Sequence, residues 1–304
     1  MNNTITAPRL PVRVAISPLS WANEVIEEFG KDATAELCLT GALAAGYEGV
    51  EMSRLFPRSP DELNTLLASY HLSLASGWHS GFLAERSVDE ELSAVHEFAT
   101  LLQKTGVRVM VYGECAAMAE NALDVPMSHR QRLATAQMAD YGARLTEFAR
   151  ELAERYGLAM AYHHHLMMVI ETHDEIRQLM AATGDEVGLL LDTGHALTGG
   201  FSYVDLINEF GPRITHIHLK DVRQQVLENV RSEDLSFNDA VRAGMFTIPG
   251  DGVIDFRPLF EFVNCSGYDG WVVVEAEQDP SLERPEITVA RARDWLSTIL
   301  PSRS

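Results

Sequence analysis

Gly188-Leu-Leu-Leu-Asp192-Thr-Gly-His195 is an apolar run that leads directly into a carboxylate, a polar turn and an imidazole. A continuous run of this kind is typical of a strand buried on both faces, as in a parallel sheet. A carboxylate at the end of such a strand is costly to bury unless it is paired or binds a metal. In α/β folds, ligands bind at that end of the sheet. The alternative role for Asp192 is to cap a following helix.

The same alternation of apolar strand and amphipathic helix recurs along the chain. The expected strands are residues 12–17, 47–52, 71–78, 107–112, 158–162, 188–192, 214–218 and 270–275. The expected helices are residues 34–45, 61–70, 89–104, 128–156, 172–183, 203–210, 256–264 and 283–300. Eight alternations predict an α/β fold, a parallel (β/α)₈ TIM barrel. A doubly wound open sheet is the alternative, but no GxGxxG motif follows the first strand.

The 304 residues predict a single TIM-barrel domain over 1–304, with residues 1–11 as a flexible extension. Between the seventh and eighth strands we expect a loop-rich insertion with a tight turn at Pro249-Gly-Asp-Gly252, whose neighbours should line the barrel mouth.

Composition excludes several classes of protein. The net charge of −20, from 44 acids and 24 bases, disfavours nucleic acid as a partner. No apolar run approaches the ~20 residues that span a membrane, and no signal peptide is recognisable at the N-terminus, so we expect a cytoplasmic protein. The three cysteines, Cys38, Cys115 and Cys265, form no CxxC pair, which argues against a disulfide framework or a thiolate zinc site.

Polar residues gather where the predicted strands end. Carboxylates and imidazoles on adjacent strands are typical ligands of a divalent metal that keeps positions open for substrate. Because Asp192, His218 and Glu275 end three consecutive strands, they should converge. Strand alternation also sends His163 and His165 to one face. The further strand-end residues are Glu51, Trp78, His79, Glu114, His164, His195, His216, Lys220 and Glu277.

Some of these residues have simpler explanations. A strand-end glutamate such as Glu51 or Glu114 is commonly one half of a salt bridge, and the histidine run could lie on the surface. Trp21 and Trp78 are either core residues or platforms for a sugar-like ring.

Several motifs together resemble the inosose dehydratases of the xylose-isomerase-like TIM barrel superfamily, which contains sugar isomerases, epimerases and dehydratases. Besides the opening stretch they are Ser17-Pro-Leu-Ser-Trp21, Ala161-Tyr-His-His-His165, His218-Leu-Lys-Asp-Val-Arg223, Phe246-Thr-Ile-Pro-Gly-Asp-Gly252 and Val274-Glu-Ala-Glu-Gln-Asp-Pro280. The resemblance implies a hydro-lyase (a carbon–oxygen lyase) of inositol catabolism that dehydrates 2-keto-myo-inositol (scyllo-inosose) to a trihydroxycyclohexane-dione. It also implies manganese or cobalt (Mn²⁺ or Co²⁺) as the metal, and glutathione as a further cofactor.

The resemblance also implies site residues. The superfamily's epimerases bind their metal through Glu, Asp, His and Glu on strands five to eight. Asp192, His218 and Glu275 match the last three, and His163 stands in place of the first glutamate. A β-elimination needs one base and one acid, so we expect Glu275 as the base and His163 or His165 as the acid, with His163 as fourth metal ligand in the alternative. The expected substrate-binding residues are Trp21, Trp78, Glu114, His195, Lys220 and Arg223.

Other functions fit parts of this pattern. A sugar or polyol-ketone isomerase or epimerase would use the same barrel and most of the same ligands. A non-catalytic polyol-binding module would need the tryptophans but not the metal ligands. The charge disfavours the superfamily's abasic-site endonucleases. The predicted partner is therefore a small polyol ketone, with neither nucleic acid nor membrane, and it stays open whether the chain forms a homo-oligomer.

Overall fold

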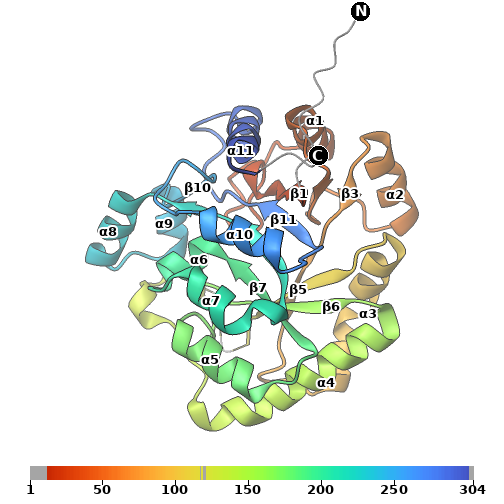
Figure 1. Cartoon of the computed structure of the whole chain (residues 1–304), viewed down its shortest axis with the longest axis vertical. Coiled ribbons are helices and arrows are strands. Elements are labelled where there is room, and N and C mark those ends of the chain that lie inside the picture. The colour runs from red at the N-terminus through yellow and green to blue at the C-terminus, as the bar shows by residue number, and fades with distance from the viewer. Residues whose placement is uncertain (1–11, 117, 119–120, 301–304) are drawn as a thin grey trace, which may run out of the picture.

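The computed structural model describes residues 12–116, 118 and 121–300. Within these residues nine strands form one sheet, and every pair of neighbours in it is parallel (Figure 1). In chain order the strands are β1 (Arg13–Ile16), β2 (Gly49–Val50), β3 (Ser73–Leu74), β4 (Trp78–Gly81), β5 (Val109–Glu114), β6 (Ala159–His163), β7 (Val187–Asp192), β8 (Ile214–Leu219) and β11 (Trp271–Val274). Their spatial order is β3-β2-β1-β11-β8-β7-β6-β5-β4.

The strands β3 and β4 are two pieces of the third predicted strand. The residues that join them hydrogen-bond to both sides: Met52 N–H donates to the Ser76 carbonyl at 3.0 Å, and Val111 N–H donates to the Gly77 carbonyl at 3.0 Å. The stretch therefore links β2 to β5 and closes the sheet on itself. The structure therefore confirms the predicted (β/α)₈ barrel and not the alternative of an open sheet.

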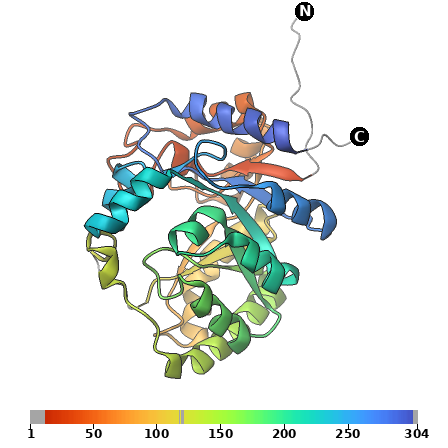
Figure 2. The same ribbon diagram turned by 60° about the vertical axis from the view of Figure 1, so that its left-hand side comes forward.

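Helices surround the strands (Figures 1 and 2). They are α1 (Ala35–Ala45), α2 (Pro60–Ser69), α3 (Val88–Lys104), α4 (Met138–Tyr156), α5 (His173–Ala182), α7 (Tyr203–Phe210), α10 (Arg257–Cys265) and α11 (Pro285–Ile299). Local signals set several ends: Thr172 and Glu175 form the predicted capping box of α5, and Gly157 ends α4 in the left-handed conformation. The helix expected over 128–156 starts only at Met138, after two short 3₁₀ turns.

The insertion after β8 is not loop-rich, contrary to the prediction. It contains β9 (Asp221–Val222), α8 (Gln224–Glu233), α9 (Phe237–Arg242) and β10 (Phe246–Thr247), and β9 pairs with β10 antiparallel. A second, smaller apolar cluster joins this unit to the barrel loops. Its buried members are Ile26, Phe29, Leu166, Met167, Val222, Leu227, Val230, Phe237, Ala240, Val241, Met245 and Phe246.

The turn at Gly250–Gly252 is an architectural element, and neither it nor its neighbours line the cavity, contrary to the prediction that its neighbours line the mouth. The Asp221 carboxylate accepts hydrogen bonds from the backbone N–H groups of Val222, Gly250, Gly252 and Ile254, at 2.8 to 3.1 Å. A Cβ at Gly252 would lie 2.3 Å from Asp221 Oδ1. A side chain at Gly252 is therefore excluded, because the backbone wraps a buried carboxylate.

We expect Asp221→Ala and Gly252→Val to lower thermal stability by roughly 3 kcal/mol, because several backbone donors lose their acceptor at ~1–3 kcal/mol each. Turnover per folded molecule should change little. Thermal unfolding at equal metal loading measures the first effect. Asp269→Ala, at an exposed ion pair, is the control and should be near neutral. If a variant at Asp221 or Gly252 kept its melting temperature but lost turnover, the turn would have to be part of the active site.

No helix in the described part of the chain is long and apolar enough to cross a membrane. The extension predicted over residues 1–11 lies outside the described residues, and the assignment of 1–304 to one domain stays a prediction.

Candidate active site

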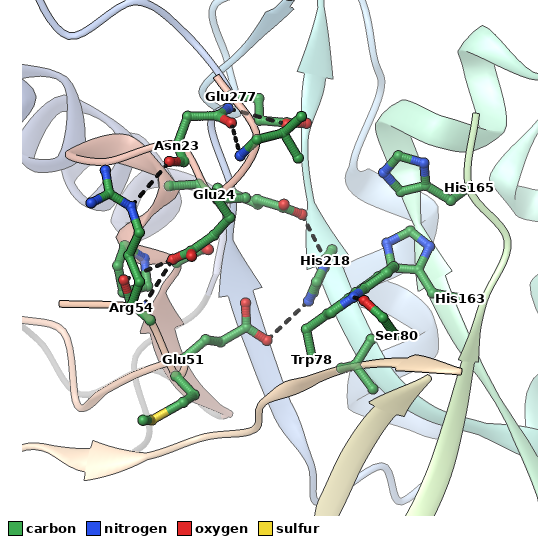
Figure 3. A pocket seen from close by; sticks show the side chains of 18 of the residues that line it. Asn23, Glu24, Glu51, Arg54, Trp78, Ser80, His163, His165, His218 and Glu277 are labelled. Atoms are coloured by element: carbon green, nitrogen blue, oxygen red, sulfur yellow. Dashed lines mark hydrogen bonds and ion pairs between the residues drawn. The ribbon is translucent and has the colours of Figure 1, made fainter. Parts of the chain in front are cut away.

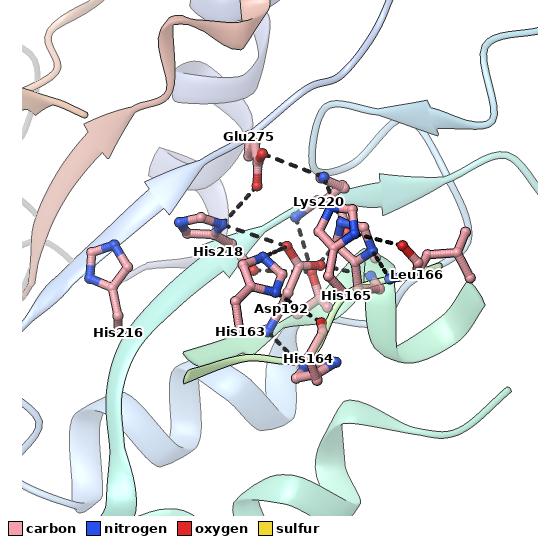
Figure 4. Close-up of polar contacts among 12 residues, drawn as sticks. His163, His164, His165, Leu166, Asp192, His216, His218, Lys220 and Glu275 are labelled. Carbon is pink, nitrogen blue, oxygen red and sulfur yellow. Dashed lines mark hydrogen bonds and ion pairs between the residues drawn. The ribbon is translucent and has the colours of Figure 1, made fainter. Parts of the chain in front are cut away.

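Four buried side chains from consecutive strand ends meet at the carboxyl end of the barrel (Figure 4). They are His163 on β6, Asp192 on β7, His218 on β8 and Glu275 directly after β11. Each offers one ligand atom, and these atoms all lie within 4.8 Å of one another. Asp192 Oδ2 is 3.7 Å from His163 Nε2 and 3.6 Å from His218 Nδ1, while His218 Nδ1 is 2.7 Å from Glu275 Oε2. All four predicted metal ligands thus come together.

The atoms at the centre of this group lack ordinary partners. Asp192 Oδ2, His218 Nδ1 and Glu275 Oε2 are buried without an aligned hydrogen bond to any described residue. Buried carboxylate oxygens and imidazole nitrogens in this state are costly, and a divalent cation would satisfy them together. Two nitrogens and two carboxylate oxygens also suit a catalytic divalent metal. The side chains therefore fit the implied metal.

Asp192 serves two purposes, one with each oxygen. It is the N-cap of the short helix α6 (Thr193–Thr198), where Oδ1 accepts the His195 N–H at 2.7 Å. Its other oxygen, Oδ2, faces the centre of the group. Capping and metal binding, which the sequence left as alternatives, are compatible because the cap fixes the carboxylate for the second role.

His163 is arranged as a ligand. Its Nδ1 hydrogen donates to the His164 carbonyl at 2.9 Å, so the Nε2 lone pair faces Asp192. Burial, with His165 and His218 nearby, lowers the pKa of His163 well below its usual range. The ring is therefore neutral at neutral pH, the form in which histidine binds a metal.

His165 faces the cavity instead. Its Nδ1 hydrogen donates to the Leu166 carbonyl at 2.7 Å (Figure 4), which leaves Nε2 for a ligand. Burial and the Lys220 charge lower the pKa of His165. Of the two histidines predicted as acid, this one has its reactive nitrogen unoccupied.

Lys220 holds the carboxylates in place from behind the cavity wall. Its Nζ lies 3.0 Å from Glu277 Oε2, 3.5 Å from Glu275 Oε1 and 3.0 Å from His195 Nε2. Burial alone would lower the pKa of Lys220, but Glu275 and Glu277 raise it. A Cβ at Gly194 would lie 2.7 Å from Lys220 Cγ, so the glycine of the opening stretch makes room for this lysine.

A cavity of about 440 Å³ opens onto the group (Figure 3). That is space for about fifteen water molecules at ~30 Å³ each, enough for a six-membered polyol ring. Its lining includes six acidic or imidazole side chains: Glu51, His163, His165, His218, Glu275 and Glu277. It also includes apolar side chains, among them Met52, Trp78, Phe98, Val111, Met168 and Phe237.

The predicted substrate-binding residues are only partly placed at this cavity. Trp78 lines it, with its ring 5.6 Å from the His163 ring and 6.0 Å from the His165 ring. His195 and Lys220 lie behind the wall, buried. Trp21, Glu114 and Arg223 are not among the residues that line it, and their assignment to substrate binding stays a prediction.

Each of these three residues has a structural role. Trp21 is 1% exposed and belongs to the main core, against Gly41. Glu114 accepts hydrogen bonds from the Tyr112 hydroxyl and from two backbone N–H groups, and burial raises its pKa to about 7. Arg223 binds the Gly244 carbonyl, Thr247 and Asp251 within the insertion.

Sequence reasoning missed several residues that line the cavity. Asn23 donates to Glu277 Oε1 at 3.4 Å, and Ser80 accepts the Trp78 indole N–H at 3.0 Å. Phe237 comes from the insertion, whose helices were not predicted. Glu277 was noted at a strand end but given no role; its position two residues after Glu275 was the available signal.

The barrel and its strand-end group define a class: TIM-barrel proteins that collect carboxylates and imidazoles at one mouth. The sequence profile of the xylose isomerase-like TIM barrel matches residues 39–299. The chain belongs to that family.

Similar proteins cover most of the chain. The rhizopine catabolism protein MocC of Rhizobium meliloti is 42% identical over 276 residues, which are 91% of this chain and 85% of that protein. An inosose dehydratase of Geobacillus thermodenitrificans (strain NG80-2) is 37% identical over 286 residues, 94% of this chain and 96% of that one. The crystal structure of the IOLI protein with a binding zinc atom superposes with a TM-score of 0.69 at 18% identity, covering 95% and 97% of the two chains, and supports the fold.

Proposed function

We propose that this chain is an inosose dehydratase, which removes water from 2-keto-myo-inositol to form a trihydroxycyclohexane-dione. The observation that carries the proposal is the group of four ligand atoms, three of them buried without aligned partners, on the wall of a ring-sized cavity. Several relatives named inosose dehydratase, at 35–37% identity over at least 94% of this chain, support the choice of substrate.

His163, Asp192, His218 and Glu275 would hold the divalent metal. When bound, the metal would supply a Lewis acid to polarise the ketone. We propose Mn²⁺ or Co²⁺, to be compared with Zn²⁺ because zinc is present in the IOLI structure. Glutathione and a cytoplasmic location stay predictions of the family resemblance, as does the choice between monomer and homo-oligomer.

The protein's own groups would move the protons. Glu275 takes the proton α to the ketone, and the C–H electron pair forms the new double bond. His165 in its protonated form carries a second hydrogen on Nε2, which faces the cavity, and delivers it to the departing hydroxyl. The C–O electron pair stays on that oxygen, which leaves as water. Lys220 holds Glu275 and Glu277 in position, and the carboxylates of Glu51 and Glu277, which line the cavity, accept ring hydroxyls.

One assay tests this function. The protein is stripped with EDTA, reloaded with Mn²⁺, Co²⁺ or Zn²⁺, and mixed with 2-keto-myo-inositol. Ultraviolet absorbance of the dione should rise only in reloaded samples. A stereoisomer of the substrate, seen by NMR without the dione, would favour the isomerase or epimerase alternative. Binding without turnover under all metals would favour the polyol-binding module.

Trp78→Ala should raise KM for the ketone about tenfold while leaving metal affinity unchanged, because an aromatic wall of the cavity is lost and no ligand is. Steady-state kinetics and chelator competition measure the two quantities. Trp21→Phe, in the core, should affect stability rather than KM. An unchanged KM in Trp78→Ala would place the ring elsewhere.

A further inference from the structure

A second polar group lies against the first and shares His218 with it. Glu51, on the loop after β2, points across the barrel toward β8. One of its oxygens, Oε1, meets two donors on β8 and a third between β3 and β4. It lies 3.0 Å from His218 Nε2 (Figure 3). It also lies 3.1 Å from His216 Nε2 and 2.5 Å from the Ser76 hydroxyl. Glu51 and both histidines are buried.

These contacts fix where the hydrogen of each imidazole sits. A carboxylate only accepts hydrogen bonds, so His216 and His218 both present Nε2–H to Glu51. Since Nε2 of His218 carries a hydrogen, Nδ1 is the atom left for a metal, and it is Nδ1 that faces Asp192 and Glu275 (Figure 4).

His163 follows the same rule with the nitrogens exchanged. Its Nδ1–H donates to a backbone carbonyl and its Nε2 faces the centre. Histidines that bind metals usually donate their other ring hydrogen to a carboxylate or a backbone carbonyl, which sets the tautomer and the ring orientation. The two imidazoles of the group show one example of each kind.

We propose that Glu51 is a positioning residue: through Oε1 it fixes the tautomer and orientation of His218, so that Nδ1 is presented to the metal. This inference rests on the proposed metal-dependent function. The sequence allowed two roles for Glu51, one half of a salt bridge or a functional residue. The proposal makes it a functional residue that acts through His218.

A competing role is a second metal ion held by Glu51, His216 and His218, whose ligand atoms also lie within 4.8 Å of one another. That ion would require both imidazoles to give up their Nε2 hydrogens and His218 to bind a metal on each side. The three donors already converging on Oε1 argue for the hydrogen-bonded arrangement, and hence for one ion per chain.

The test measures Co²⁺ affinity by chelator competition in Glu51→Gln and Glu51→Leu. Loss of such an outer partner typically costs 10–100-fold in metal affinity. Glu51→Gln, which keeps an oxygen but loses the charge, should lie near tenfold. Glu51→Leu should lie near 100-fold and should alter the visible absorption bands of bound Co²⁺. Stoichiometry should stay at one ion per chain.

Glu24→Gln is the matched control. Glu24 also lines the cavity, but its carboxylate binds Ser53 and the Arg54 backbone and does not touch the histidines. Its Co²⁺ affinity should equal that of the wild type. Circular dichroism and thermal unfolding establish that each variant is folded, and Glu51→Gln keeps the test valid if Glu51→Leu does not fold.

Three results would overturn the positioning role. The first is unchanged affinity in both Glu51 variants. The second is two Co²⁺ per wild-type chain with one lost on mutation, which would make Glu51 a ligand. If the wild type binds no Co²⁺, the proposed function fails, and ¹⁵N NMR of the imidazoles then decides the positioning role separately. A His218 Nε2–H signal that Glu51→Leu removes supports that role. A wild type without this signal is the third contrary result.

Discussion

Asp192→Asn is expected to weaken metal binding by more than about 100-fold, beyond what loss of an outer-shell partner costs, and to reduce dehydration to background. The amide keeps an oxygen for the His195 N–H, so the cap of α6 survives. It replaces Oδ2, the oxygen 3.7 Å from His163 and 3.6 Å from His218, with an NH₂ group that repels a cation. Thermal stability should not fall, because a buried carboxylate oxygen without a partner is removed.

Chelator competition and elemental analysis measure the metal, and the dione assay measures turnover at saturating metal. Asp221→Asn is the matched control, since Asp221 is equally buried and follows the next strand, β8. It should keep its metal and lose stability. Stoichiometric metal in Asp192→Asn would refute the metal centre.

His163→Gln and His165→Gln should fail in different ways, although the two residues are neighbours on one face. His163→Gln should lose the metal, because Nε2 faces Asp192 while Nδ1–H is held by a carbonyl. His165→Gln should keep the metal and lose about 10²–10⁴-fold in dehydration rate, the usual cost of losing a general acid. The amide side chain can hydrogen-bond to the leaving hydroxyl but cannot protonate it.

Exchange of the substrate's α-proton with solvent deuterium separates the two defects. His165→Gln should still exchange this proton, because Glu275 and the metal are intact, whereas His163→Gln should not. Circular dichroism checks the fold of both variants. The reverse outcome, with metal and exchange kept in His163→Gln and metal lost in His165→Gln, would exchange the roles of acid and ligand.

Local signals in the sequence were sufficient to predict the barrel. Apolar runs ending in polar residues, alternating with amphipathic helices, predict parallel strands buried on both faces, and the structure has them. The convergence of Asp192, His218 and Glu275 also follows from sequence, because the carboxyl ends of parallel strands open on one side. The identity of the implied reaction came from the resemblance of whole motifs and not from any one residue.

Only the tertiary structure placed residues outside the strands and resolved their roles. Trp21 and Arg223 stand in motif stretches, yet one packs in the core and the other binds the insertion, because the path of a loop depends on distant partners such as Gly41 and Asp251. The choice between His163 and His165 required knowing which ring nitrogen each backbone carbonyl occupies. Glu51 reaches His218 across 167 positions of sequence, a contact that barrel closure creates and no local pattern encodes.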